Sequence, residues 1–239
     1  MVKPYRAKVL MDNLPEDIVS LFRRARSLPR NRRLGFFASN FVGYPYHLFP
    51  LGEGLDKPRL DFSRFDCLTF VEEMLALTLS DSVDELLPTL DRIRYKNGVV
   101  SFLTRNHFPS IDWIPNNSHL FRDITEDFEH TFIEKKIDKK AFFEEYSYRY
   151  DGKSVLVRVS VVPPDAIPRR LPAPLVVFFA RVNPKTIFTH AGLVIEEKGE
   201  LLLYNASSEK RAVVRERFSD YLEHKEDILG VKLLFLSHC

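Results

Sequence analysis

One cysteine in this 239-residue chain is placed where a thiol can act as a nucleophile. Cys67 follows an aspartate in the segment RFDCLTFVEEMLALTLS, whose apolar run predicts a helix. Ser63 and Asp66 have the spacing of a capping box, and this register places Cys67 in the first helical turn. Unpaired N–H groups and the helix dipole stabilise a thiolate there, while the charge of Asp66 opposes it. The position favours thiol chemistry without requiring it.

A thiol nucleophile needs a general base, and His190 is the best candidate among the seven histidines. It begins the apolar strand FTHAGLVI, where the small residues Ala191 and Gly192 allow another element to approach closely. A hairpin with the segment ELLLYNASS follows. With a turn of either two or four residues, Asn205 shares the face of His190, because strand side chains alternate with period two. Asn205 is therefore expected to reach the imidazole and orient it.

Each of these three residues also has a structural interpretation. A cysteine on an apolar helix is most often a buried core residue. A histidine at the start of a strand is more often structural, and Asn205 before Ala-Ser-Ser could be a turn residue. Together, a cysteine at a helix start and a His/Asn pair on one strand face are the parts of a papain-like site, in the order Cys, His, Asn.

The elements that position these residues begin with helices. Amphipathic spacing predicts a helix over residues 14–28, and the segment after Cys67 predicts another. Residues 83–95 predict a third, with a break or a late start at Pro88. Residues 123–150 are also helical in character. The N-terminal half of the chain is therefore mostly helical by pattern.

Strands dominate the second half. Residues 43–58 are rich in Pro and Gly and predict an ordered loop leading to the cysteine, and residues 97–117 also predict a loop. Because helices come first and strands last, the fold class is α+β. The β-type segments are residues 154–162, 173–182, 189–197, 200–208 and 231–237.

Composition excludes several classes of partner. The length and the 45% hydrophobic content allow one large core, alone or with an insertion. The formal net charge is only +2 and the sequence has no long basic arm, so a nucleic acid is not an expected binding partner. No apolar run approaches the roughly 20 residues of a membrane span. The N-terminus lacks the apolar core of a signal peptide, which predicts a cytoplasmic protein as written, or an envelope protein if a leader is missing.

No metal, other cofactor or disulfide is predicted. Two cysteines cannot make a disulfide framework, and Cys239 is the last residue, so Cys67 is expected to be a free thiol. The scattered His107, His119 and His130 lack metal-ligand spacing, and nucleotide-binding glycine patterns are absent.

Several blocks in order closely resemble one protein family. They are FDCLTFVEEMLAL, RIRYKNGVVSFLTRNHFPSIDWIPNN, DIT, THAGLVI and LLYNASS. From Gly43 to the C-terminus the chain resembles the N-acetylmuramoyl-L-alanine amidase-like branch of the bacterial NlpC-type cysteine peptidase superfamily. The resemblance implies a papain-like NlpC-type fold in one catalytic domain (1–239), in which the nucleophile-bearing helix packs on an antiparallel sheet carrying the histidine. It also implies an N-terminal helical part (1–42) and a cleft-shaping insertion (about 95–150). We expect a monomer.

The resemblance implies roles for five residues. Cys67 matches the nucleophile, His190 the general base, and Asn205 the third polar position, where the family more often has histidine. Tyr46 matches a tyrosine that would hold the oxyanion together with the Cys67 backbone N–H. Asp66 matches the superfamily's Asp-Cys motif, where it would bind substrate or cap the helix, and the two roles remain open.

The block RNHFPSIDW resembles the branch-specific insertion. Arg105, His107, Asp112 and Trp113 would suit sugar rings and peptide carboxylates in a substrate cleft. Their alternative interpretation is a structural network beneath a loop. The chain departs from the family in lacking Gly-Asp before the strand ahead of His190 and in having Phe108 where tyrosine is common, which concerns fine specificity.

The activity implied is hydrolysis of the lactyl–L-alanine amide in soluble peptidoglycan fragments (muropeptides), including anhydro-sugar forms. Two alternatives remain open. The chain could be an endopeptidase of the same superfamily that cuts wall peptides after D-glutamate. It could also be a muropeptide-binding module that retains the cleft without turnover.

Overall fold

The computed structural model describes residues 16–54, 56–225 and 227–237. Leu14, Pro15 and Cys239, which figured in the predictions, lie outside the described residues. Helix α2 falls inside the helix predicted over residues 14–28. The α-helices are α2 (Glu16–Ala25), α3 (Arg30–Asn40), α4 (Cys67–Leu79), α5 (Val83–Arg94), α6 (Ile114–Asn116), α7 (Lys139–Glu145) and α8 (Phe218–Glu223). Short 3-10 or π turns occur at Lys96–Gly98, Phe102–Thr104, Pro109–Trp113, Ser118–Leu120, Thr125–Asp127 and Pro164–Ala166.

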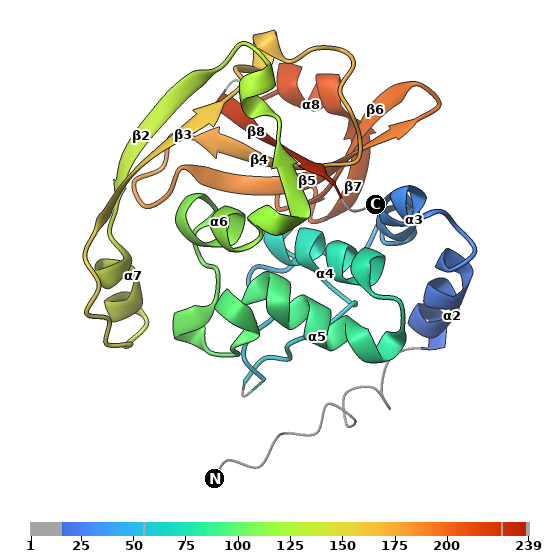
Figure 1. Cartoon of the computed structure of the whole chain (residues 1–239), viewed down its shortest axis with the longest axis horizontal. Coiled ribbons are helices and arrows are strands. Elements are labelled where there is room, and N and C mark those ends of the chain that lie inside the picture. The colour runs from blue at the N-terminus through green and yellow to red at the C-terminus, as the bar shows by residue number, and fades with distance from the viewer. Residues whose placement is uncertain (1–15, 55, 226, 238–239) are drawn as a thin grey trace.

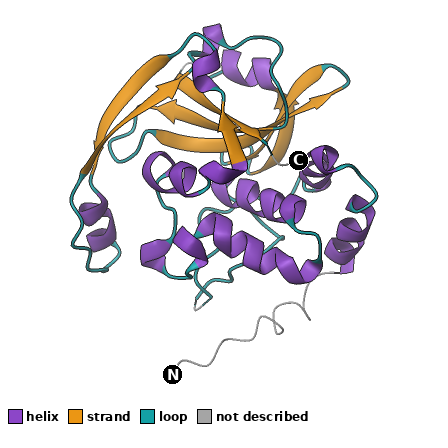
Figure 2. Cartoon of the chain, in the orientation of Figure 1, coloured by secondary structure: helices purple, strands orange, loops and turns teal. Residues whose placement is uncertain are grey.

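A six-stranded antiparallel sheet forms the second half of the molecule (Figure 2). Its strand order is β1-β8-β4-β5-β6-β7, and a separate antiparallel ribbon joins β2 to β3. The strands are β1 (Phe121–Asp123), β2 (Thr131–Ile137), β3 (Val155–Val161), β4 (Leu175–Arg181), β5 (Phe188–Glu197), β6 (Glu200–Ser207), β7 (Ala212–Arg217) and β8 (Ile228–Leu236). The mixed α+β architecture with an antiparallel sheet is confirmed, and all five predicted β segments are strands.

Both faces of the sheet are covered, which explains the uniformly apolar sequence of β4. Helices α4 and α5 lie on one side of the sheet and α8 on the other (Figure 1). Val176, Phe178 and Ala180 of β4 belong to the core on the α4 side. The alternate residues Val177 and Phe179 belong to the core on the α8 side. A strand buried on both faces has no solvent face for polar residues.

Helix α4 is buried from Thr69 to Thr78, including two glutamates at its middle. Glu72 accepts from Arg94 Nε at 2.8 Å and from Trp113 Nε1 at 3.2 Å, and Arg94 also donates to the Arg59 carbonyl. Both charged side chains of the Glu72–Arg94 pair are essentially inaccessible to solvent. Because each buried charge has its partner, the pair fixes α4 against α5.

The expected break at Pro88 is wrong, because α5 runs without interruption from Val83 to Arg94. Proline removes one intrahelical hydrogen bond, here to the carbonyl of Asp84. Pro88 and Asp84 both lie on the exposed face of the helix, so water can satisfy that carbonyl.

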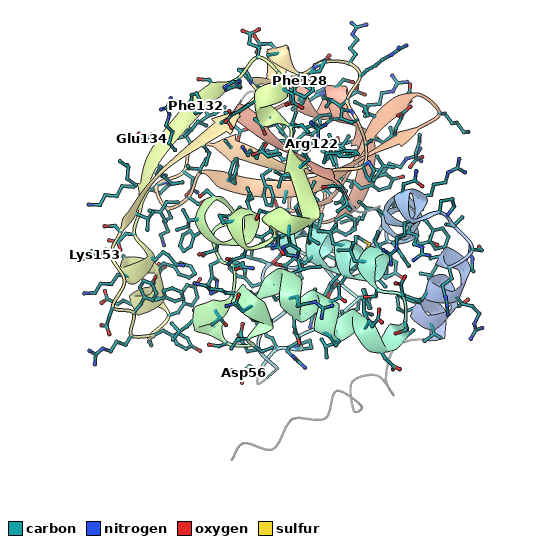
Figure 3. The ribbon with its side chains drawn as sticks, viewed as in Figure 1. Asp56, Arg122, Phe128, Phe132, Glu134 and Lys153 are labelled. Atoms are coloured by element: carbon teal, nitrogen blue, oxygen red, sulfur yellow. The ribbon has the colours of Figure 1, made fainter. Side chains whose placement is uncertain are left out.

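The helical interpretation of residues 123–150 is also wrong for most of that segment. Strand β2 pairs with β3 from Thr131↔Val161 to Ile137↔Val155, and only the short α7 is helical beyond it. The alternating burial of β2 is the period-two pattern of a strand. Figure 3 shows Phe132 and Glu134 at the outer margin of the molecule, along this arched ribbon.

We expect Arg94→Leu to lower the free energy of unfolding by about 3–5 kcal/mol, because it leaves the Glu72 carboxylate buried without its cation. Urea denaturation measures this change. Lys140→Gln removes one partner of the exposed Lys140–Glu144 pair and should cost less than about 1 kcal/mol. Similar losses in the two variants would contradict the role assigned to the buried pair.

Candidate active site

Cys67 is the first residue of α4, and Asp66 is its N-cap. Asp66 Oδ1 accepts from the backbone N–H groups of Leu68 (3.1 Å) and Thr69 (2.8 Å), and Thr69 Oγ1 accepts from the Asp66 N–H. The first-turn position of Cys67 is confirmed. The capping box itself begins three residues later than predicted, because Ser63 bonds Asp61 instead.

The other carboxylate oxygen of Asp66 ties the helix start to the preceding loop. Asp66 Oδ2 accepts from the Phe49 N–H at 3.2 Å, and the Asp66 residue is buried. The helix-cap interpretation of Asp66 is therefore observed directly. A role for Asp66 in binding substrate stays a prediction.

His190 and Asn205 meet across the β5–β6 hairpin. The pairing of Glu197 with Glu200 leaves a two-residue turn, one of the two predicted registers. On the shared strand face, a hydrogen bond of 3.0 Å joins His190 Nε2 to Asn205 Oδ1. Since Oδ1 can only accept, Nε2 carries the proton and Nδ1 is left as an acceptor.

Gly192 permits this close meeting of the two strands. A Cβ atom at Gly192 would lie 2.7 Å from Leu203 Cδ1, 3.0 Å from the Tyr204 carbonyl oxygen and 3.2 Å from Asn205 Cβ. The end of the Leu203 side chain would have to move, and β6 at Tyr204 and Asn205 would have to give by a few tenths of an ångström. The absence of a side chain at this position therefore sets where Asn205 lies.

The Cys67 sulfur lies beside the residue that follows His190. The backbone N–H of Ala191 interacts with the sulfur, as do the N–H groups of Leu68 and of Cys67 itself. The pairing of β5 with β6 stops at Leu193↔Tyr204, which leaves the Ala191 N–H free for this contact. The structure thus places the Cys67 sulfur at the residue next to His190, and the His190 ring against Asn205.

Burial keeps both the thiol and the imidazole uncharged. It raises the pKa of Cys67 to about 12, with a further contribution from the Asp66 charge, and the three N–H groups offset only part of this. Burial also lowers the pKa of His190 to about 4, against the effect of the Asn205 hydrogen bond. Near neutral pH the resting thiol and the resting imidazole are therefore both neutral.

Two tyrosines flank the pair. Burial is the main cause that raises the pKa of Tyr46 to about 12, and the charges of Cys67 and Asp66 raise it further. The phenol of Tyr46 therefore stays a neutral hydrogen-bond donor. Tyr221 of α8 stacks on His190, with ring centroids 6.0 Å apart and planes 23° apart. The sequence had indicated Tyr46 but not Tyr221, because neither α8 nor β7 before it was predicted.

The structure corrects the expectation that Trp113 lines a cleft. Its ring is fully buried, donates to Glu72 and stacks on Phe121, so no substrate can contact it. Asp112 is also buried and accepts from Lys139 Nζ at 2.7 Å. Both side chains thus have structural partners within the protein, and contact of Asp112 with substrate stays a prediction.

Arg105 and His107 also have partners within the protein. Arg105 Nη1 donates to the Leu51 carbonyl at 3.0 Å. A ring nitrogen of His107 lies 2.7 Å from the Phe102 carbonyl oxygen, and burial lowers the His107 pKa to about 4. Both side chains are half-buried, and their contact with substrate stays a prediction.

No group of three or more His, Cys, Asp or Glu side chains within residues 16–54, 56–225 and 227–237 is arranged to hold a metal ion. In the same part of the chain, every helix is too short or too polar to cross a membrane.

Comparison with known proteins identifies a sequence family. The family described as AmiA-like, N-acetylmuramoyl-L-alanine amidase-like, matches residues 36–231. None of the curated protein sequences is significantly similar to this chain.

Two solved structures share the fold. Protein LPG0564 from Legionella pneumophila, of the family DUF1460, is 24% identical over 97% of both chains, with a TM-score of 0.84. An N-acetylmuramoyl-L-alanine amidase from Bacteroides uniformis is 21% identical over 87% of this chain and 98% of its own, with a TM-score of 0.71. At sequence identities below 25%, this structural similarity establishes that the chains share a fold.

The neutral thiol predicts a steep pH dependence of alkylation. In a Cys239→Ser background, the rate of Cys67 alkylation by iodoacetamide should rise about tenfold per pH unit from pH 6 to pH 9, because only the thiolate reacts. Intact-protein mass spectrometry follows the rate, with a Cys67→Ala, Cys239→Ser double variant as the blank. A plateau below pH 9 would instead indicate a preformed thiolate–imidazolium pair.

Proposed function

Since the chain belongs to the N-acetylmuramoyl-L-alanine amidase-like family, we propose that it is a cysteine-dependent amidase of peptidoglycan fragments. Its substrate is the amide between the lactyl group of muramic acid and L-alanine. The family description supports a hydrolase of the peptidoglycan-amidase type. The amidase from Bacteroides uniformis supports the same substrate class by its name. The nucleophile and the preference for anhydro-muropeptides are parts of this proposal.

One observation supports the proposal that amide hydrolysis depends on a cysteine. The Cys67 sulfur lies at the Ala191 N–H, next to a histidine whose Nε2 is held by Asn205. Cysteine at a helix start, histidine on a strand and an orienting asparagine are the parts of a papain-like site. This order also supports assignment of the chain to the papain-like NlpC-type superfamily.

The first step forms a carbon–sulfur bond. His190 Nδ1 takes the Cys67 proton as the sulfur attacks the lactyl carbonyl carbon. Because the resting pair is neutral, proton transfer accompanies the attack and does not precede it. The negative charge that develops on the carbonyl oxygen is stabilised by the Cys67 backbone N–H at the start of α4 and by the Tyr46 hydroxyl.

The later steps return the proton and release both products. The carbon–nitrogen bond breaks as His190 gives its Nδ1 proton to the L-alanine nitrogen, and the peptide leaves. Water, deprotonated by His190, then hydrolyses the thioester to release the muramic acid carboxylate and regenerate the thiol. Asn205 Oδ1 holds the ring orientation throughout and stabilises the imidazolium through the Nε2–H bond.

Product analysis tests the proposal. We expect mass spectrometry to detect intact peptides beginning with L-alanine after incubation with defined muropeptides, with and without the anhydro sugar. Cys67→Ala should abolish this release. Release of a sugar still bearing L-Ala-D-Glu would identify an endopeptidase. No cleavage by the folded protein would contradict the proposed activity and favour a binding module.

Gly192→Ala should lower kcat/KM by on the order of 100-fold, because a displaced Asn205 no longer holds the imidazole in register. Steady-state kinetics on the same muropeptides measures the loss. Gly199→Ala is the matched control at the other end of this hairpin. It strains a turn residue with φ of 83°, but its Cβ would meet nothing within 4 Å. Equal losses in both variants would point to general weakening of the hairpin.

A further inference from the structure

Arg181, the last residue of β4, lies beside the candidate site. Strand alternation places it on the same sheet face as Phe179, which contacts both the His190 ring and the Tyr221 ring. Arg181 Nη2 donates to the Tyr221 hydroxyl at 3.0 Å. Tyr221 in turn stacks on His190. A guanidinium is therefore held at a fixed place one side chain away from the imidazole.

The hydrogen-bonding capacity of this guanidinium is only partly used. Its Nε lies 3.3 Å from Asp227 Oδ2, within ion-pair distance, but this nitrogen is buried and has no hydrogen-bond partner in the part of the chain that the structure describes. The side chain of Asp227 is 61% exposed and that of Arg181 is 23% exposed. Arg181 thus combines a fixed position with partial access from solvent.

The charged groups that act on His190 are two cations. Arg181 and Lys225 both act on the imidazole and lower its pKa. Lys225 pairs with Glu209, whose side chain is mostly exposed. The anionic partners of the two cations, Glu209 and Asp227, thus extend into solvent, while Arg181 is held next to the imidazole by Tyr221.

In the proposed reaction the leaving peptide starts at the imidazole. His190 protonates the L-alanine nitrogen, so the peptide extends from the imidazole. In an extended peptide, the carboxyl carbon of the second residue lies on the order of 6 Å from the first nitrogen, since successive Cα atoms are about 3.8 Å apart. The His190 and Tyr221 rings are 6.0 Å apart. The reach of such a peptide thus matches the distance from the imidazole to Tyr221, so a carboxylate on the second residue can reach Tyr221 and its bound guanidinium.

We propose that Arg181 binds the free carboxylate of the second residue of the leaving peptide, D-glutamate in a muropeptide, and so sets specificity for the peptide. This inference rests on the amidase function proposed above. An arginine fork matches a carboxylate in two parallel hydrogen bonds, which distinguishes it from an uncharged amide. Arg181 acts on binding and takes no part in proton transfer.

A pair of substrates that differ in one group tests this role. One is N-acetylmuramoyl-L-Ala-D-Glu, and the other carries D-isoglutamine, in which an amide replaces the carboxylate. The wild-type chain should favour the first by about 10- to 100-fold in kcat/KM. Arg181→Gln should bring this ratio close to one. Lys185→Gln removes an exposed lysine paired with Glu145, is the matched control, and should keep the wild-type ratio.

The outcomes separate this inference from the function on which it rests. If neither substrate is cleaved by the wild-type chain, the proposed amidase function fails. If both are cleaved with the same ratio by wild type and Arg181→Gln, only the role of Arg181 fails. Arg181→Lys keeps the charge without the fork and should give an intermediate ratio. Thermal unfolding and Cys67 alkylation of each variant exclude a folding defect as the cause of a changed ratio.

Discussion

The burial of α4 from Thr69 to Thr78 is the constraint on which the rest of the structure depends. A helix buried on all sides has to satisfy its polar residues internally, and Glu72 does so with Arg94 at 2.8 Å. Burial raises the pKa of the adjacent Glu73 well above its usual value, and this side chain accepts from the Asp61 N–H. These contacts fix the helix to α5 and to the loop before it. The start of α4, and with it Cys67, consequently has one position against β5.

Desolvation at the start of α4 and on β5 determines the charge state of the candidate site. Removing water penalises both the thiolate and the imidazolium, and it moves the two pKa values apart, to about 12 for Cys67 and about 4 for His190. Because the thiolate is the reactive form, a neutral thiol does not react readily with other electrophiles. In the mechanism that we propose, charge separation occurs only as an acyl group is attacked, with Tyr46 and the helix N–H groups beside the developing oxyanion.

The sequence predicts best those features that follow from local periodicity. The two-residue period predicts the five β segments and the shared face of His190 and Asn205. It does not predict where distant segments meet. The burial of Trp113 depends on Glu72, 41 residues away in sequence, and Tyr221 reaches His190 only because α8 packs on the sheet. The error at Pro88 has a different origin, since a solvent-exposed helix face tolerates the loss of one hydrogen bond.

Asparagine at the third position suits this buried, neutral pair. A histidine there would introduce a second titrating group and a second choice of tautomer, whereas the Asn205 amide presents an uncharged acceptor to His190 Nε2. The arrangement has a cost, because Asn205 Nδ2 is buried without a hydrogen-bond partner among the described residues. An unsatisfied donor of this kind costs about 1–3 kcal/mol. Packing at Gly192 holds the amide in place despite that cost, so the imidazole orientation is set by the backbone of the hairpin.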